Sequence, residues 1–414
     1  MSQAKPFSIS KQVVWDAYKR VKANKGTYGV DEQSIQDFEK RLKDNLYKLW
    51  NRMSSGCYFP PPVRTVEIPK GDGRMRPLGI PTVSDRIAQM VVKVYFEPKV
   101  EPFFHPDSYG YRPNKSAIEA VGVARKRCWR YDWVLDLDIK GFFDNLDHDL
   151  LMRAVRKHTD CKWVLLYIER WLKAPAQLED GTLVNRDKGT PQGGGISPLL
   201  ANLFLHYAFD EWMRKNYPHI PWARYADDIV AHCKTEAEAI TLRTAIADRL
   251  AQCRLELHSE KTKVVYCRDG KRRRNYPNDK FDFLGFTFRL RKVVNRSGKF
   301  FIGFGPAVSK QSAKKICRTL RRLQLHLYVD KTLDDIAQTL NPALRGWINY
   351  YGSYYKSALR PVFWHLDRRL VNWAVRKYKR FAGHRRRARR WLAEIARRQP
   401  YLFAHWQMLG RPSA

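Results

Sequence analysis

Two adjacent carboxylates inside an apolar stretch constrain this chain more than any other feature. Asp227 and Asp228 lie between Trp222-Ala223 and Ile229-Val230-Ala231. This arrangement is typical of a buried strand or hairpin rather than a solvated loop. Burying two neighbouring negative charges costs several kcal/mol unless a cation accompanies them or one of them is protonated. The stretch alone allows two interpretations, an acidic turn at a hairpin tip or a site for a divalent metal ion.

The charge balance predicts a polyanionic partner. The 414 residues include 77 Lys+Arg against 41 Asp+Glu, a net charge of +36, and 44% of them are hydrophobic. A chain of this length and composition folds into two or three domains, and its excess of cations favours a partner whose affinity falls as salt rises. A membrane surface is the alternative.

The absence of targeting signals and the spacing of the cysteines indicate the cellular compartment. No apolar run reaches the roughly 18 residues of a membrane-spanning helix, and residues 1–20 lack a signal-peptide core. These patterns favour a cytoplasmic or organelle-matrix protein. The seven cysteines are scattered and never form a C-x-x-C pair, so we interpret them as reduced core thiols and not as zinc ligands.

The N-terminal part of the chain predicts helices followed by a hairpin. Helical periodicity covers residues 9–55, and residues 63–69 alternate like a strand. A glycine-rich tip with Lys70, Arg74 and Arg76 follows, and it fits either a phosphate-binding loop or a solvated turn. The spacing of Ser116 and Glu119 predicts a capping box and a helix to about Cys128.

The middle of the chain predicts a sheet backed by helices. A strand over 133–139 places Asp136 and Asp138 on one face, because side chains alternate along a strand. Helices are expected over about 149–157, 162–173, 197–212 and 235–253, with Ser197 and Thr235 as N-caps, and strands over 255–257 and 263–266. This order predicts an α+β fold built on a split βαβ antiparallel sheet.

Three carboxylates can meet if two of these strands are neighbours. Asp138 lies on one strand, and Asp227 with Asp228 lies on another. Three carboxylates around two Mg²⁺ ions suit an in-line phosphoryl transfer, in which one ion activates a 3′-hydroxyl and the other stabilises the leaving pyrophosphate. A structural role for Asp136 and Asp138, accepting hydrogen bonds from nearby loops, is the alternative.

The last third of the chain is helical and cationic. Residues 306–381 carry 16 Lys+Arg against 4 Asp+Glu, with clustered rings at Trp347, Tyr350, Tyr351, Tyr354 and Tyr355. Cationic helices with rings suit a nucleic-acid surface, especially one that binds RNA, although the rings could instead belong to a core. The segment 384–390 predicts a basic helix or arm that binds a phosphate backbone.

Five motifs in order carry a resemblance to a known family. They are Tyr-Ala-Asp-Asp at 225–228, Asp-Ile-Lys-Gly-Phe-Phe-Asp at 138–144, Pro-Gln-Gly-Gly at 191–194 with Ser-Pro-Leu-Leu-Ala-Asn at 197–202, Arg-Pro-Leu-Gly-Ile-Pro at 76–81 and Phe-Leu-Gly-Phe at 283–286. Over about residues 10–292 the chain resembles a reverse transcriptase of the bacterial group II intron type. Residues 340–351 resemble the maturase, or thumb, domain of the same proteins, to about Phe381.

The resemblance implies a right-hand polymerase fold. The expected domains are an N-terminal helical extension at 1–62, fingers and palm at 63–292, a helical thumb or maturase domain at 306–381 and a basic C-terminal segment at 382–414. The turn from Gly26 to Asp31 resembles the extension that closes over the template, although the glycine common after the aspartate is Glu32 here.

The resemblance also assigns roles to individual residues. Asp138, Asp227, Asp228 and the backbone carbonyl of Ile139 match the groups that hold two Mg²⁺ ions. Lys70 and Arg76 match residues that hold the incoming triphosphate, Phe143 matches the gate against a ribose 2′-hydroxyl, and Gln192 matches a residue of the nucleotide pocket. Candidate nucleic-acid contacts are Arg112, Lys261, Arg345, Trp347, Arg386 and Arg387.

The implied function is RNA-directed DNA polymerisation with intron RNA binding and splicing. Its partners would be template or intron RNA, a DNA primer or target, and dNTPs, in a bacterial cytoplasm and at the nucleoid when acting on DNA. Alternatives are an enzyme recruited to DNA repair or phage defence, and a non-enzymatic RNA-binding splicing cofactor. No cysteine-rich endonuclease module is recognised, so priming from a nick or a replication fork is expected. The cognate RNA and the oligomeric state, including a homodimer, stay open.

Overall fold

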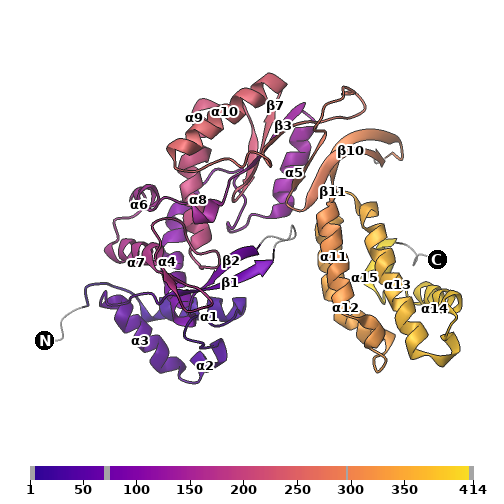
Figure 1. The fold of residues 1–414 in the computed structure, drawn as a ribbon, viewed down its shortest axis with the longest axis horizontal. Coiled ribbons are helices and arrows are strands. Elements are labelled where there is room, and N and C mark those ends of the chain that lie inside the picture. Colours follow the sequence, from indigo (N-terminus) through magenta and orange to yellow (C-terminus); the bar gives the residue numbers. More distant parts are fainter. Residues whose placement is uncertain (1–4, 70–74, 295–296, 410–414) are drawn as a thin grey trace. The chain divides into compact units, whose positions relative to one another are not determined.

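The computed structural model describes residues 5–69, 75–294 and 297–409. The chain divides into two compact units: Met1–Ala120 with Leu135–Lys263, and Val121–Val134 with Val264–Ala414 (Figure 1). The predicted phosphate-binding tip with Lys70 and Arg74 lies outside the described residues. Within the described ranges, no helix has both the length and the apolarity needed to cross a membrane.

The first unit begins with helices and a small sheet, as the periodicity predicts. Its first elements are α1 Lys11–Asn24, α2 Ile35–Glu39, α3 Leu42–Ser54, β1 Val63–Pro69, β2 Met75–Ile80 and α4 Val83–Val100. Strands β1 and β2 are antiparallel, with Arg76 opposite Ile68. With β4 Ala176–Gln177 and β5 Leu183–Val184 they form a sheet of order β2-β1-β4-β5.

A second sheet carries the acidic motifs. It contains β3 Trp133–Asp138, β6 Trp222–Tyr225, β7 Asp228–Cys233 and β8 Lys263–Tyr266 in the order β6-β7-β3-β8. The boundary between the two units passes through β3 and β8. Asp136 and Asp138 are half-buried while Leu135 and Leu137 are buried, so the two carboxylates share one face of β3 as predicted.

Further helices of the first unit lie in the chain between these strands. They are α6 His148–Arg156, α7 Lys162–Lys173, α8 Ser197–Leu205, α9 Glu211–Asn216 and α10 Glu236–Gln252, of which α10 packs on β7. The cap at Thr235 is confirmed, because its hydroxyl accepts a hydrogen bond from the Glu238 backbone N–H at 3.1 Å. The capping box of Ser116 and Glu119, which opens α5 Ala117–Cys128, is confirmed too.

Two predictions near these helices are wrong in detail. The helix expected over 197–212 is interrupted by a π-helix at His206–Asp210. Ser197 does not cap α8, because its hydroxyl instead accepts a hydrogen bond from the Thr190 hydroxyl at 2.8 Å. The strand expected over 255–257 is only an isolated bridge between Leu257 and Ile139, because the segment makes too few ladder bonds to form a strand.

The second unit combines a three-stranded sheet with helices. Its order is β11-β10-β9, from β9 Lys280–Phe283, β10 Phe286–Val294 and β11 Phe300–Val308. Then follow α11 Lys310–Arg322, α12 Leu333–Tyr351, α13 Arg360–Lys377, α14 Arg385–Arg398 and α15 Ala404–Leu409. The strand β11 continues through Pro306, which pairs with Phe288, so the helical part begins only after Ser309 caps α11.

The clustered tyrosines of the second unit pack inside it. The ring of Phe286 lies 5.2 Å from the ring of Tyr350, 5.6 Å from Tyr351 and 5.9 Å from Tyr354, between centroids. The Tyr350 hydroxyl donates to the backbone carbonyl of Leu284 at 2.9 Å. These contacts favour the core interpretation for the three tyrosines over a role as an exposed stacking surface.

A buried carboxyl group gives the first unit a pH-dependent stability. Asp85 is 1% exposed and accepts hydrogen bonds from Tyr58 at 2.8 Å, Trp171 at 2.6 Å and Gln89 at 2.9 Å. Burial raises the pKa of Asp85 to about 6, although these hydrogen bonds oppose the shift. The folded state therefore binds the proton more tightly than the unfolded chain, and stability falls as pH rises from about 4 to about 6.

We expect Asp85→Asn to remove this pH dependence. The amide stays neutral, and its oxygen can still accept from Tyr58 and Trp171. The free energy of unfolding of the wild type, minus that of the variant, should fall by about 2 kcal/mol between pH 4 and pH 6.5. Urea denaturation across this range measures the difference. A difference that does not change with pH would show that Asp85 titrates normally.

Glu32 holds a backbone conformation that favours glycine. Its φ is 53°, in the left-handed region, where a side chain costs about 1–2 kcal/mol. We expect Glu32→Gly to raise the free energy of unfolding by about 0.5–1 kcal/mol, since glycine relieves the strain but loses more chain entropy. Glu32→Ala, which also removes the charge but keeps the strain, is the matched control and should show no such gain in urea denaturation.

Candidate active site

The two adjacent carboxylates lie at the tip of a hairpin, as predicted. Strands β6 and β7 are antiparallel, and Tyr225 pairs with Asp228. Ala226 turns the chain with a φ of 57°, and its side chain is buried, whereas Asp227 and Asp228 are half-buried. The tight turn therefore directs two carboxylates away from the apolar sheet without placing them in bulk solvent.

A buried ion pair connects strand β6 of this hairpin to Asp210. Arg224 and Asp210 both have fully buried side chains, and the guanidinium donates to the two carboxylate oxygens at 2.8 and 2.6 Å. Arg224 also donates to Asn202 Oδ1 at 3.0 Å and to the carbonyl of Ala226 at 3.2 Å. Burial alone would raise the pKa of Asp210, but Arg224 and His206 hold it below its usual value.

A glycine allows a loop to approach the hairpin closely. The backbone N–H of Tyr109 donates to the carbonyl of Arg224 at 2.8 Å, and Asn202 Nδ2 donates to the carbonyl of Gly110 at 2.6 Å. A Cβ atom on Gly110 would collide with the backbone nitrogen of Ala226. The loop therefore fixes the turn only because residue 110 has no side chain.

Asp138 and Lys261 form an ion pair at the end of β3. The Nζ atom of Lys261 lies 2.6 Å from Asp138 Oδ2, and the two side chains are 52% and 33% exposed. The carbonyl of Asp138 accepts from the His258 N–H at 2.8 Å, which fixes the strand end. An ammonium group thus occupies one oxygen of the first predicted metal ligand.

The electrostatics of Asp227 place it close to Asp138. Burial raises the pKa of Asp227, the negative charge of Asp138 raises it further, and the cations Arg76 and Lys261 oppose the shift. The strand β7, which Asp228 begins, is the neighbour of β3, which Asp138 ends, so the charge of Asp138 acts on Asp227 across two adjacent strands, and a bound cation would favour the ionised form of Asp227. The structure therefore brings together the two strands that the sequence separates by almost ninety residues.

A second set of polar groups joins β2 to the loop before α8. Gln192 Nε2 donates to both carboxylate oxygens of Asp144, at 3.0 and 3.2 Å, and its Oε1 accepts from Arg76 Nε. The Gly79 N–H donates to the carbonyl of Gln192 at 2.9 Å. Arg76 and Gln192, both predicted to contact the nucleotide, are therefore in direct contact with one another.

Phe143 and Ile139 lie close to Asp138 in the sequence. Phe143 belongs to a short 3-10 helix, its side chain is 8% exposed, and its carbonyl accepts from the Thr190 N–H at 2.8 Å. Ile139 follows Asp138 at the end of β3 and its side chain is buried. Their roles as ribose gate and metal contact stay predictions.

Arg112 differs from its predicted role as a nucleic-acid contact. Its guanidinium is 7% exposed, lies 2.8 Å from Glu101 Oε1 and donates at 2.7 Å to the carbonyls of His105 and Ser108. Because its donors are used inside the protein, we do not propose it as a nucleic-acid contact.

The remaining candidate contacts lie on helices of the second unit. Arg345 is exposed on α12, and Trp347 is half-buried against the apolar core of this unit. Arg386 and Arg387 are exposed on α14, whose opposite face buries Ala388 and Leu392. These arginines are free to meet a phosphate backbone, whereas Trp347 contributes mainly to packing.

The sequence alone did not identify several residues of the site. Asp144, Asp210, Arg224 and Tyr111 act beside the predicted carboxylates, and the Tyr111 and Tyr225 rings lie 6.0 Å apart. Asp144 ends the recognised motif at 138–144 and Arg224 directly precedes the motif at 225–228, so both positions could have been noticed in the sequence. Asp210 has no such signal, because its role depends on an ion pair between distant segments.

Among the described residues, no three or more His, Cys, Asp or Glu side chains are close enough together in this structure to hold a metal ion. The donor set nevertheless fits a hard divalent cation, which prefers carboxylate oxygens. The charge of Asp138 disfavours the ionised form of Asp227. Among the described ion pairs, the only cation within 3 Å of Asp138 is Lys261. A metal ion would replace that ammonium group.

Comparison with known proteins identifies the class. Residues 68–288 match the family described as "Reverse transcriptase (RNA-dependent DNA polymerase)", and residues 313–391 match "Group II intron, maturase-specific domain". The chain belongs to the reverse transcriptase family and carries a group II intron maturase-specific domain. The predicted relationship to group II intron reverse transcriptases is therefore confirmed.

Two relatives illustrate the similarity. The chain is 33% identical to Protein YkfC of Escherichia coli over 311 residues. The aligned region covers 66% of this chain and 78% of YkfC. It is 29% identical over 364 residues to the group II intron-encoded protein LtrA of Lactococcus lactis, covering 71% of this chain and 58% of LtrA.

Proposed function

We propose that this chain is a template-dependent polymerase that copies RNA into DNA, with a right-hand arrangement of fingers, palm and thumb. Strands β1 and β2 would belong to the fingers, the sheet β6-β7-β3-β8 to the palm, and the helices after Ser309 to the thumb. The observation that supports the proposal best is the position of Asp227 and Asp228 at the tip of the β6-β7 hairpin, with Asp138 at the end of the neighbouring strand β3.

The residues of this site would divide the work as follows. Asp138, Asp227 and Asp228, with the carbonyl of Ile139, would hold two Mg²⁺ ions, which supply activation of the 3′-hydroxyl and charge stabilisation of the leaving pyrophosphate. Arg76, together with Lys70, would bind the triphosphate of the incoming dNTP. Gln192 would keep Arg76 oriented through its bond to Asp144.

Lys261 and Phe143 would complete the pocket. Lys261, which pairs with Asp138 in this structure, would leave that carboxylate to a metal ion and would bind the polyanionic substrate instead. Phe143, whose carbonyl accepts a hydrogen bond from the Thr190 N–H, would restrict the space beside the sugar and so disfavour ribonucleotides.

Removal of divalent metal tests the polymerase proposal directly. We expect primer extension on an RNA template with dNTPs and Mg²⁺, and complete loss of extension when EDTA is added in excess. Restoring Mg²⁺ should restore the rate, since Asp138 keeps a cation partner, Lys261, when the metal is absent. Extension that continues in EDTA would exclude the proposed metal-dependent mechanism.

We also propose that the chain binds intron RNA and assists its splicing. The maturase-specific match over residues 313–391 includes α12, α13 and part of α14, where Arg345, Arg386 and Arg387 are exposed. Exposed arginines on helices suit an RNA phosphate backbone. A homodimer, a bacterial host and a nucleoid location would be compatible with this activity.

Splicing is tested with the RNA encoded around this reading frame. If a group II ribozyme flanks it, we expect the protein to accelerate splicing at low Mg²⁺, and Asp228→Ala to retain that acceleration because RNA binding does not need the catalytic carboxylate. If no ribozyme flanks the frame, the enzyme recruited to repair or defence becomes the better proposal.

A further inference from the structure

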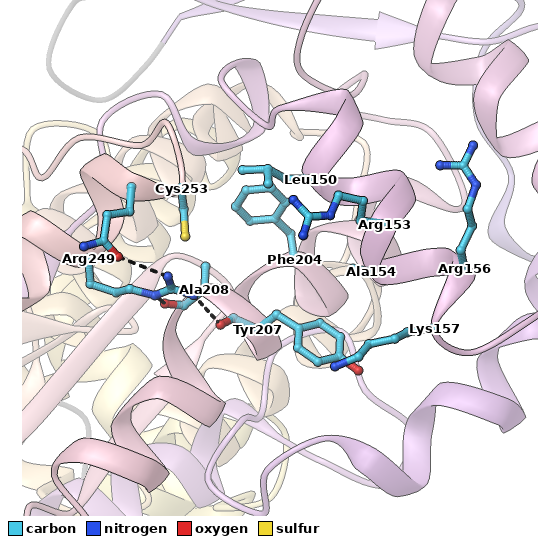
Figure 2. Close-up of a pocket in the computed structure, with 11 residues that line it drawn as sticks. Leu150, Arg153, Ala154, Arg156, Lys157, Phe204, Tyr207, Ala208, Arg249 and Cys253 are labelled. Atoms are coloured by element: carbon cyan, nitrogen blue, oxygen red, sulfur yellow. Dashed lines mark hydrogen bonds between the residues drawn. The ribbon is translucent and has the colours of Figure 1, made fainter.

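A cavity of the first unit has a charge pattern that the polymerase site does not explain. It has a volume of about 640 Å³ and is lined by residues of α6, α8, the π-helix and α10 (Figure 2). Its described lining includes four cations and no carboxylate; these cations are Arg153, Arg156, Lys157 and Arg249. None of the predicted catalytic carboxylates is among the residues that line it.

The cavity lining includes apolar side chains, which we call its floor, and the ring of Tyr207, which a hydrogen bond holds in place. Leu150, Phe204 and Ala208 line it, and Figure 2 shows Leu150 and Phe204 in the centre, between Arg249 and Arg153. The Tyr207 hydroxyl is hydrogen-bonded to His158 Nε2 at 2.7 Å, and Lys157 Nζ lies 4.6 Å from the Tyr207 ring centroid. A planar ligand would contact the apolar side chains of the floor and the Tyr207 ring, which lies beside the Lys157 ammonium group.

Hydrogen bonds between Arg249 and the π-helix hold one side of the cavity in place. Arg249 Nη2 donates to the carbonyl of Tyr207 and Nε donates to the carbonyl of Ala208, each at 3.1 Å, while Nη1 donates to Gln252 Oε1 at 3.3 Å. Both carbonyls lie in the π-helix that interrupts the helix after α8. This rare wider turn often marks a functional site.

Two of the cations at the rim are exposed for a ligand. Arg153 on α6 and Lys157, which caps its C-terminus, lie about one helical turn apart, and the described lining of the cavity contains no carboxylate to pair with them. A cationic pair beside an apolar floor fits a ligand that is anionic at one end and planar and apolar at the other.

We propose that this cavity binds a nucleoside phosphate. The phosphate would contact Arg153 and Lys157, and the base would lie on the floor near Phe204 and Tyr207. The volume falls within the range of roughly 300–1,000 Å³ of small-molecule sites, whereas inorganic phosphate would fill only part of it. The ligand is either a free nucleotide or one nucleotide of an RNA strand.

Photo-crosslinking locates the site. The full chain is mixed with 8-azido-ADP in EDTA, which suppresses metal-dependent binding at the carboxylate site, then irradiated and digested. We expect the label on peptides that contain Tyr207 or Cys253, and excess ADP should prevent it. Label confined to peptides around Arg76 or Gln192, or no label that ADP prevents, would overturn the proposal.

Charge reversal tests the contacts with a matched control. The double variant Arg153→Glu/Lys157→Glu should bind fluorescent N-methylanthraniloyl-ADP at least about tenfold more weakly than the wild type. Lys215→Glu/Arg243→Glu makes the same change in net charge at exposed positions outside the lining and should change binding less than about twofold. Equal weakening in both would show a general charge effect and overturn the proposal. Thermal unfolding by circular dichroism verifies that both variants are folded.

Competitors identify the source of the nucleotide. A 5′-phosphorylated RNA tetranucleotide that displaces the probe better than ADP would support a strand, and ADP displacing it better would support a free nucleotide. Displacement by hexaglutamate as good as by ADP would overturn the nucleotide proposal in favour of an acidic peptide.

The proposal is independent of the polymerase activity. Asp227→Ala, which should disable polymerisation, should keep the wild-type affinity for the probe in EDTA. Loss of probe binding in Asp227→Ala would instead place the nucleotide at the carboxylate site and overturn the proposal. Failure of primer extension in the wild type would leave the crosslinking and charge-reversal results unchanged.

Discussion

Asp227→Ala is expected to reduce the rate of nucleotide incorporation on an RNA template by at least about 10³-fold. The carboxylate lies at the hairpin tip, and its pKa is raised by burial and by the charge of Asp138. If the pair holds metal ions, losing one member removes several kcal/mol of transition-state stabilisation, which corresponds to this factor. Steady-state incorporation of a single dNTP at saturating Mg²⁺ measures the effect.

The control for this experiment is a carboxylate outside the site. Asp248 is exposed on α10, so Asp248→Ala should retain the wild-type rate. Binding of the RNA–DNA primer complex should be retained by Asp227→Ala, since the cationic surface is unchanged. An Asp227→Ala protein that keeps more than about a tenth of the activity would contradict the metal-binding role of this residue.

Asp210→Ala is expected to destabilise the first unit by about 3–5 kcal/mol. The substitution leaves the fully buried guanidinium of Arg224 without its carboxylate partner, and desolvating an unpaired charge is costly. Because Arg224 also donates to the carbonyl of Ala226, the turn that carries Asp227 should loosen and primer extension should fall as well. Urea denaturation measures the loss of stability.

Two further variants separate charge from packing. Asp210→Asn keeps one acceptor for Arg224 and should cost less than half as much as Asp210→Ala. The apolar pair Asp210→Leu/Arg224→Met should recover much of the stability, because replacing both partners leaves no buried charge. A cost below about 1 kcal/mol for Asp210→Ala would show that water reaches Arg224 and that the pair does not hold the hairpin.

Patterns that depend on near neighbours in the chain were predictable. Alternation along β3 placed Asp136 and Asp138 on one face, and the caps at Ser116 and Thr235 follow from residues three positions apart. The interruption of the helix after α8 was not predictable, because an apolar run continues through it. The π-helix there coincides with tertiary contacts of Arg249 and Arg224 that no local pattern contains.

The amino-acid sequence by itself determined the family, the order of the elements and the candidate carboxylates Asp138, Asp227 and Asp228. These depend on residue types at fixed short spacings, which a single chain displays directly. Only the tertiary structure decided that Lys261 pairs with Asp138, that Gln192 links Arg76 to Asp144 and that Arg112 is used internally. Partners far apart in the chain are chosen by packing and by the cost of burying unpaired charge, which act only in the folded protein.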